Sequence, residues 1–129
     1  MKKLFLIFTL LFSTAMSSSP VRAEWTRVSE NVSGTIFYVD LGRIRKHDGY
    51  VYFWDLTNFL KPNEYGDWSI KVYRQADCKQ FRHKGLSFSF YKEPMGNGIA
   101  DTYNPPDKGW KYPSPNSVAE TILKTVCSQ

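Results

Sequence analysis

The chain has few of the residues from which metal sites and thiol chemistry are built. Its 129 residues include two cysteines and two histidines, and the cysteines are not spaced as Cys-x-x-Cys. Redox-active pairs commonly use that spacing, and a structural zinc site needs four nitrogen or sulfur ligands close together. The composition therefore argues against both kinds of site, and we expect neither a metal ion nor another cofactor.

Apolar runs long enough to span a bilayer are also missing. The run at residues 4–12 is too short for a span. It follows Met1-Lys2-Lys3 and precedes a spacer of small residues ending at Ala23, which is typical of a secretory signal. We expect residues 1–23 to be removed on export, leaving residues 24–129 as a single domain. Because no cysteine lies near the predicted cleavage site, we expect no lipid group and no stable membrane anchor.

The positive charge of the whole chain belongs mostly to the export signal. The net charge is +5, from 17 basic and 12 acidic residues. Lys2, Lys3 and Arg22 leave with the signal, so 14 basic and 12 acidic residues remain, and the net charge falls to +2. A nucleic-acid-binding domain usually keeps a strongly basic patch. We therefore expect no nucleic acid partner.

No catalytic pattern stands out in the remaining sequence. Acidic residues that could form a hydrolytic pair occur at predicted strand ends and turns, where carboxylates commonly bond the backbone. They are Asp40, Asp55, Asp67, Asp77 and Glu93. His47 lies beside Asp48, but no motif places a nucleophile with them. Gly96-Asn97-Gly98 lacks the lysine of a phosphate loop. We predict that the protein is not an enzyme. A small hydrolase is the enzyme class that these acidic residues would favour, and it ranks below two non-enzymatic functions described below.

Alternating apolar and polar residues predict a sheet. Expected strands, rich in β-branched and aromatic residues, lie at 24–29, 35–40, 50–56, 68–78 and 86–91. Turns are expected at 31–34, 46–49, 61–67 and 94–98. The segment 50–56 is apolar on both faces, which indicates a place in the middle of the sheet. Because no long helix separates these strands, they should pair antiparallel.

Residues 99–129 predict a connector and a helix. Residues 99–116 contain four prolines and should form an extended surface connector, not a central strand. Ser117 and Glu120 form a capping box, in which the serine accepts from a first-turn amide and the glutamate reaches back to the serine amide. An apolar stripe follows at helical spacing. It consists of Ala119, Ile122, Leu123, Val126 and Cys127.

Cys78 and Cys127 are expected to form one disulfide, because an even number of cysteines in a small exported chain usually pairs. This bond would hold the apolar stripe of the helix against the drier side of the strand at 68–78. The predicted fold class is therefore α+β: a twisted antiparallel sheet of about five to six strands, with one C-terminal helix packed on a face and linked to it by the disulfide.

Several features follow one another in a fixed order along the chain. The order is a tryptophan after the signal, a Tyr-Val-Asp strand end, an aromatic strand, a strand ending in Asp-Cys, a glycine turn, a tryptophan, a Pro-Ser-rich helix entry and a terminal cysteine. In this chain these are Trp25, Tyr38-Val39-Asp40, Val51-Tyr52-Phe53-Trp54, Asp77-Cys78, residues 94–98, Trp110, residues 113–117 and Cys127. This series resembles the surface-adhesin protein E family of exported bacterial proteins.

The resemblance implies an antiparallel sheet with a packed helix and a Cys78–Cys127 bridge. It also implies adhesion, since the namesake protein is surface-exposed and binds host extracellular-matrix and serum proteins. The chain departs from that protein by having no lipid-acceptor cysteine after its signal. We therefore expect an exported protein that is periplasmic or secreted, or held at the cell surface.

A partner surface is predicted where aromatic and basic residues gather. Tyr52, Trp54 and Tyr73 should share the sheet face away from the helix, and Lys79, Arg82 and Lys84 follow the first cysteine. Two interpretations remain open: the aromatics contact a protein partner or a second copy of the chain in a homodimer, or they pack against one another and the connector. The leading hypothesis is a non-enzymatic, adhesin-like binding module. Its alternative is a periplasmic structural or envelope-associated protein without a host ligand.

Overall fold

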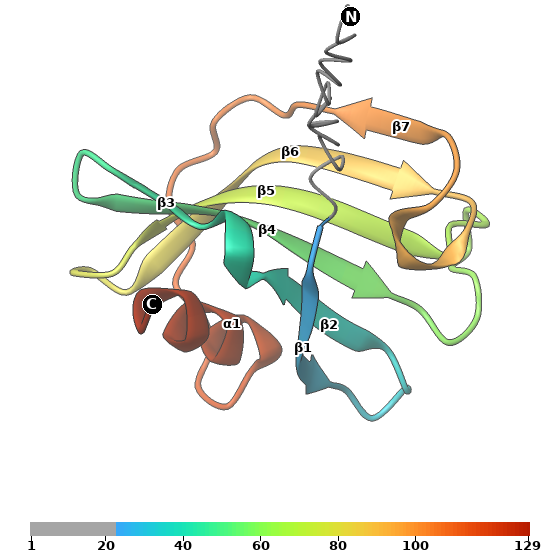
Figure 1. Cartoon of the computed structure of the whole chain (residues 1–129), viewed down its shortest axis with the longest axis horizontal. Coiled ribbons are helices and arrows are strands. Elements are labelled where there is room, and N and C mark those ends of the chain that lie inside the picture. The colour runs from blue at the N-terminus through green and yellow to red at the C-terminus, as the bar shows by residue number, and fades with distance from the viewer. Residues whose placement is uncertain (1–22) are drawn as a thin grey trace, which may run out of the picture.

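The computed structural model describes residues 23–129, which form one antiparallel sheet and one α-helix (Figure 1). The predicted signal, residues 1–23, lies outside the described residues except for Ala23. The strands are β1 (Trp25–Glu30), β2 (Ile36–Asp40), β3 (Arg45–His47), β4 (Tyr50–Asn58), β5 (Ser69–Asp77), β6 (Arg82–Tyr91) and β7 (Ala100–Tyr103). The helices are α1 (Val118–Cys127) and the short 3₁₀ turns η1 (Leu41–Arg43) and η2 (Pro94–Gly96).

The strands lie in the order β1-β2-β4-β5-β6-β7, and β3 pairs with β4 beside β2. Val39 of β2 pairs with Asp55, and Arg45 of β3 pairs with Tyr52. The strands β2 and β3 thus form one line along β4, interrupted by η1. Since β4 has neighbours on both sides, the prediction that the apolar segment 50–56 lies inside the sheet is confirmed.

The turn predicted at residues 46–49 is too long. Lys46 and His47 belong to β3, and the turn consists of Asp48 and Gly49, with φ angles of 50° and 81°. Positive φ at both central positions is the requirement of a two-residue type I′ hairpin. All residues of β3 are exposed, so this short strand is polar in sequence and resembles a loop.

The connector predicted at residues 99–116 begins later than expected, because Ala100–Tyr103 forms β7 and pairs with β6. The prolines start at Pro105, so they exclude strand structure only after this point. All four residues of β7 are exposed at the edge of the sheet. The strand β6 also starts earlier than predicted, at Arg82. The two strands β3 and β7, added to the five predicted ranges, bring the number of strands to seven.

The helix α1 begins as predicted, after Ser117. The Ser117 hydroxyl accepts a hydrogen bond from the Glu120 amide at 3.1 Å. The Glu120 carboxylate accepts from the Asn116 amide at 3.4 Å, not from Ser117 as expected. The Ser117 amide is already used, because it donates to the Ser114 carbonyl. The reciprocal half of the predicted capping box is therefore shifted by one residue.

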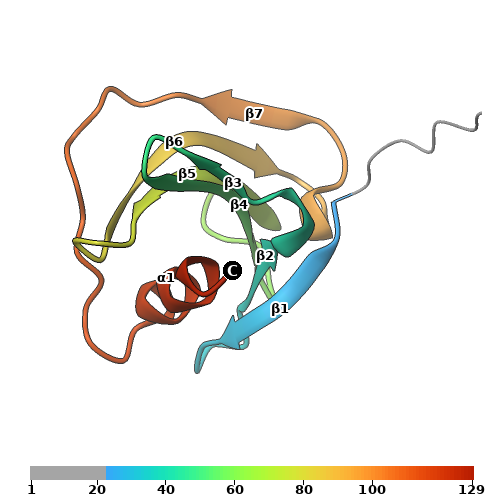
Figure 2. The same ribbon diagram turned by 60° about the vertical axis from the view of Figure 1, so that its left-hand side comes forward.

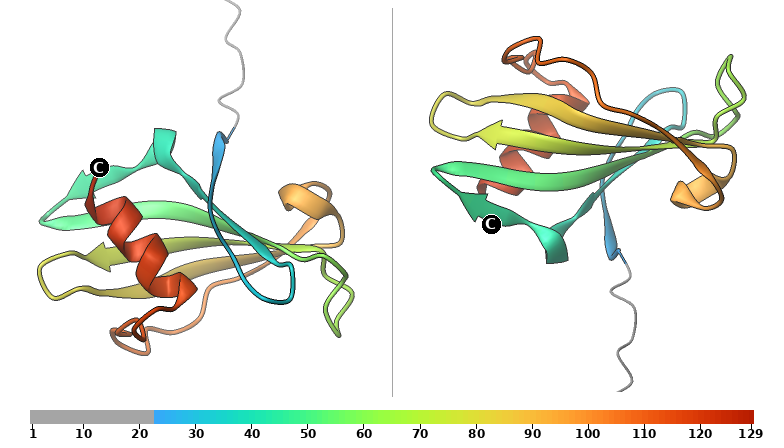
Figure 3. Two further views of the ribbon diagram at one scale, coloured as in Figure 1. Left: turned by 90° about the horizontal axis from the view of Figure 1, so that it is seen from below. Right: turned by 90° about the horizontal axis from the view of Figure 1, so that it is seen from above.

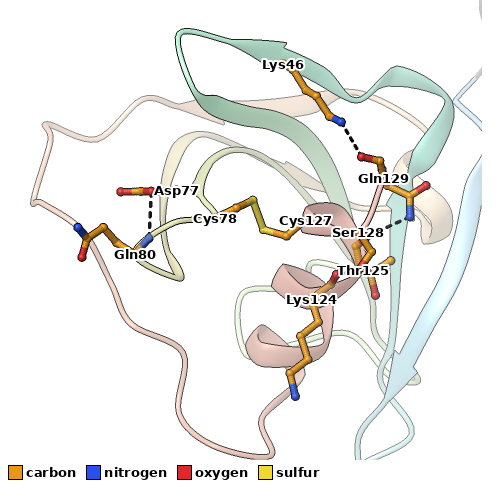
Figure 4. The surroundings of a disulfide bond; sticks show 9 residues. All are labelled: Lys46, Asp77, Cys78, Gln80, Lys124, Thr125, Cys127, Ser128 and Gln129. Atoms are coloured by element: carbon orange, nitrogen blue, oxygen red, sulfur yellow. Dashed lines mark hydrogen bonds between the residues drawn. A yellow bond between two sulfur atoms is a disulfide. The ribbon is translucent and has the colours of Figure 1, made fainter.

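The sheet curls around α1, which lies across one face (Figures 2 and 3). Its buried residues Ile122, Leu123 and Val126 pack against the sheet in a single core cluster. The sheet side of that cluster consists of Val39, Val51, Phe53 and Ala76. Figure 4 shows the predicted Cys78–Cys127 disulfide, which joins the turn after β5 to the last turn of α1. The predicted α+β architecture is confirmed.

Candidate functional site

The sheet face away from α1 carries a cluster of aromatic side chains. In β4, Tyr52 and Trp54 alternate with the core residues Val51 and Phe53, so they point away from the helix. Tyr73 of β5 is the cross-strand neighbour of Trp54. Its ring centroid lies 5.0 Å from that of Trp54 and 6.1 Å from that of Tyr52. We call Tyr52, Trp54 and Tyr73 the central aromatic cluster.

A second group of rings surrounds Lys71, two residues before Tyr73 on the same face. The Lys71 ammonium lies 5.1 Å from the ring centroid of Tyr91 and 5.7 Å from that of Trp25. These distances suit cation–π attraction. The turn η2 borders this end of the face, because the Gly96 amide donates to the Ser69 hydroxyl and the Met95 amide donates to the Asn58 side chain.

At the opposite end, the connector after β7 lays Trp110 against the sheet. The ring centroid of Trp110 lies 5.5 Å from that of Tyr50. The Arg82 guanidinium carbon and the Lys84 ammonium lie 4.6 Å and 4.4 Å from the Trp110 centroid. We call Tyr50, Arg82, Lys84 and Trp110 the basic corner. With the central aromatic cluster and the group around Lys71, it forms one surface that we call the aromatic face.

Arg82 and Lys84 reach this face because β6 contains a bulge. Tyr73 pairs with Ser87, but the next residue, Arg74, pairs with Gly85, so Leu86 is an extra residue in β6. A bulge reverses the alternation of every residue before it. Counting back by twos from Phe88 would place Arg82 and Lys84 on the helix side, whereas the bulge turns them to the aromatic face.

Both basic residues of the corner have carboxylate partners. The Arg82 Nε donates to Asp77 at 2.8 Å, and the Lys84 ammonium donates to Asp107 at 2.9 Å. Desolvation tends to raise the pKa of Asp77, but the hydrogen bonds from Arg82 and the Gln80 amide outweigh it and hold that pKa below its usual value. The hydrogen bond from Lys84 lowers the pKa of Asp107 in the same direction. Both pairs are therefore charged at neutral pH.

The structure separates the three predicted basic residues. Arg82 and Lys84 lie together on Trp110, while Lys79 lies exposed in the turn between β5 and β6. His83, between Arg82 and Lys84 in sequence, faces the other way, because it pairs with the core residue Ala76. Within residues 23–129, Lys79 makes no ion pair, so it is the least screened charge of the predicted set.

The acidic residues considered for hydrolysis do not form a pair. Four of the five each have their own cation, and the partners come from different parts of the sheet, while Glu93 makes no ion pair among residues 23–129. The pairs are Asp40 with Arg43, Asp55 with Arg74, Asp67 with Lys92, and Asp77 with Arg82. His47 lies exposed beside Asp48 in the β3–β4 hairpin. In residues 23–129, no three His, Cys, Asp or Glu side chains are grouped so that they could hold a metal ion.

Two tryptophans of the aromatic face were not predicted from the sequence as members of it. Trp25 and Trp110 served there as markers of the family pattern. A lone tryptophan within a polar, proline-rich connector is a signal that this segment packs on the domain, since a large ring rarely stays in water without contact. The surface it packs on depends on the path of the connector, which the pattern of residues 104–117 does not give.

Comparisons with known proteins agree with this fold. Residues 25–128 match the family described as Surface-adhesin protein E. Solved structures of Haemophilus influenzae protein E have the same fold. Crystal form II is 20% identical with a TM-score of 0.64, covering 84% of this chain and 90% of that one. The protein from a non-typeable strain is 18% identical with a TM-score of 0.59, covering 85% and 79%.

No curated protein matches the chain in sequence. In the part that the structure describes, no helix has the length and hydrophobicity that a membrane span requires. The family match extends from β1 to the end of α1 and includes both cysteines of the disulfide. On this match, the chain belongs to the Surface-adhesin protein E family.

Proposed function

We propose that this chain is an exported, non-enzymatic binding protein that contacts a protein partner, such as a host extracellular-matrix protein, through its aromatic face. The observation that carries the proposal is the continuous row of half-buried rings and cations on the sheet face opposite α1. Tyrosine, tryptophan and arginine are enriched at the centres of protein interfaces. The adhesive function named in the family description supports the same choice.

Truncation of Tyr73 tests the aromatic face directly. Its ring contacts both Tyr52 and Trp54, so Tyr73→Ser opens the middle of the central aromatic cluster. We expect the affinity for a bound extracellular-matrix protein to fall about tenfold or more, the usual loss at an interface hot spot. Surface plasmon resonance on a panel of immobilised matrix proteins measures the change.

Tyr65→Ser is the matched control, because Tyr65 is 74% exposed in the loop between β4 and β5 and makes none of the ring contacts of the aromatic face. Equal affinity of the two variants and the unaltered protein would contradict the proposed surface. Size-exclusion chromatography of the same proteins tests the homodimer hypothesis. If the unaltered protein is a dimer and Tyr73→Ser is a monomer, the aromatic face binds a second copy of the chain.

Location decides between an adhesin and a periplasmic protein. We propose that residues 1–23 direct export and that the domain reaches the cell surface or the medium. Protease added to intact cells should then degrade the protein, or the medium should contain it. Full protection until the outer membrane is opened would favour the alternative, a structural or envelope-associated role inside the periplasm.

A further inference from the structure

A cavity of about 170 Å³ lies on the other side of the sheet, between α1 and the strands. The helix contributes Val118, Ala119 and Ile122 to its wall, and the sheet contributes Phe37 and Phe53. Most of the lining is therefore apolar, and the cavity is partly open to solvent. Cavities of roughly 150 Å³ with such walls accept a ligand the size of benzene. Nothing in the aromatic face contributes to it.

One part of the lining is charged. Arg74 and Asp55 lie on the helix side of adjacent strands, and the Arg74 Nε donates to the Asp55 carboxylate. A guanidinium has five N–H donors, and this bond uses one. Among the described residues, Nη1 and Nη2 of Arg74 make no hydrogen bond. The pair thus leaves a two-pronged donor group at an apolar cavity, which is the arrangement that binds a carboxylate.

His83 supplies a second polar group in the same wall. Its backbone is held at the sheet edge by two hydrogen bonds with Lys111, of 2.9 Å and 2.8 Å. Its Nδ1 atom is buried and has no hydrogen-bond partner within residues 23–129. Burial, and then the charges of Arg74 and Lys111, lower the pKa of His83 to about 4. The ring is neutral at physiological pH, so it can donate one hydrogen bond to a ligand without adding charge.

We infer that this cavity binds a small organic monocarboxylate, with its carboxylate on the Nη groups of Arg74 and an aromatic or branched body between Phe53 and Ile122. Charge favours an anion over a cation, because two cations, Arg74 and Lys111, act on His83, whereas Asp55 is the one carboxylate in the described lining. The volume limits the body to about one six-membered ring. This inference is independent of the partner proposed for the aromatic face.

Benzoate is the probe, and benzyl alcohol is its uncharged counterpart. Isothermal titration of the purified, oxidised protein should give saturable binding of benzoate, about tenfold tighter than benzyl alcohol, since the guanidinium fork distinguishes a carboxylate from a hydroxyl. Amide NMR shifts should be confined to residues around the cavity, including Ala119 and His83. Absence of saturation, or equal binding of the two probes, would overturn the inference.

Ala119→Leu should fill the cavity from the helix and abolish benzoate binding. Thr121→Leu is the matched control, because it adds an apolar side chain to the exposed side of the same helix. Arg74→Lys keeps the charge beside Asp55 but loses the fork, so it should weaken benzoate about tenfold and leave benzyl alcohol unchanged. Unaltered benzoate binding by a folded Ala119→Leu or Arg74→Lys protein would place the ligand elsewhere and reject the site.

Discussion

Three consecutive basic residues of β6 lie in two different surroundings. Arg82 and Lys84 stack on Trp110 at the aromatic face, each with a carboxylate partner, while His83 lies on the helix side with a buried, unpartnered Nδ1. A run of basic residues in the sequence thus does not make a continuous basic patch. A substitution at His83 therefore tests a different property from a substitution at Arg82 or Lys84.

Exchanging His83 for glutamine should reduce the acid sensitivity of the fold. The pKa of His83 is about 4 in the folded protein and 6.5 in an unfolded chain, so the unfolded chain binds the proton more tightly. The free energy of unfolding should therefore fall as the pH decreases from 6.5 to 4. With a discount for the partial exposure of the ring, we expect a difference on the order of 1 kcal/mol.

Urea denaturation at several pH values between 7 and 4 measures this difference. Carboxylates that titrate in the same range are common to both proteins and cancel in the comparison, and above pH 6.5 the histidine should make no pH-dependent contribution. Parallel profiles for the original protein and His83→Gln would show that the ring is protonated equally in the folded and unfolded states.

At the scale of elements, the bulge at Leu86 has the widest effect. A period-two pattern assigns Leu86, Phe88 and Phe90 to one side of β6. For the residues that precede Leu86, the side that this pattern assigns is reversed. Gly85 is part of this arrangement: a Cβ atom there would lie 2.5 Å from the Phe88 ring, so the ring occupies the space that a side chain would need. Because of the bulge and the missing side chain, Arg82 and Lys84 face the aromatic face, although they are spaced by twos from Phe88 on the helix side.

The cap of α1 should contribute measurably to stability. Ser117→Ala removes the oxygen that accepts from the Glu120 amide. We expect the free energy of unfolding to fall by about 1 kcal/mol, the usual cost of losing a serine N-cap. Ser114→Ala is the control, because Ser114 takes part in this turn through its backbone carbonyl. Equal losses in the two variants, measured by urea denaturation, would contradict a specific role of the Ser117 hydroxyl.

At the scale of the whole molecule, the disulfide holds the helix layer to the sheet layer. It joins positions 49 residues apart, and the chain between them includes β6, β7, the connector and most of α1. The disulfide lies on the side of the sheet opposite the aromatic face, near the hydrogen bond that Lys46 donates to the carbonyl of Gln129 (Figure 4). The partner binding that we propose for the aromatic face and the packing of the helix therefore use different sides of the sheet.

Replacing both cysteines by serine should lower the free energy of unfolding by roughly 4 kcal/mol, because a loop of this length loses much of its unfolded-state entropy when closed. That loss is comparable with the whole stability of many small domains. Denaturation of the Cys78→Ser/Cys127→Ser protein in urea measures it, and the unaltered protein treated with reductant should behave alike. A loss below about 1 kcal/mol would mean that the core under α1 holds the helix without the bond.

Much of the fold follows from short-range patterns in the sequence. The alternation in β4 and β5, the serine cap and apolar stripe of α1, and the pairing of two cysteines depend on neighbours a few residues apart or on composition, so they could be predicted. The same alternation brought Tyr52, Trp54 and Tyr73 to one face, since each lies in a regular part of its strand.

The rest depends on long-range geometry. The bulge in β6 determines which side of the sheet Arg82, His83 and Lys84 face, and the connector places Trp110 against β6. The spacing of nearby residues predicts neither the pairing register of β6 nor the path of the connector. The cavity beneath Ala119 exists only because a tethered helix meets a curled sheet. The sequence by itself therefore determined five of the seven strands, the helix and the cross-link, through local hydrogen bonding and hydrophobic periodicity. Tertiary structure alone decided which charges and which distant tryptophans join the central aromatic cluster on one surface, because side chains far apart in the chain meet only after the layers pack.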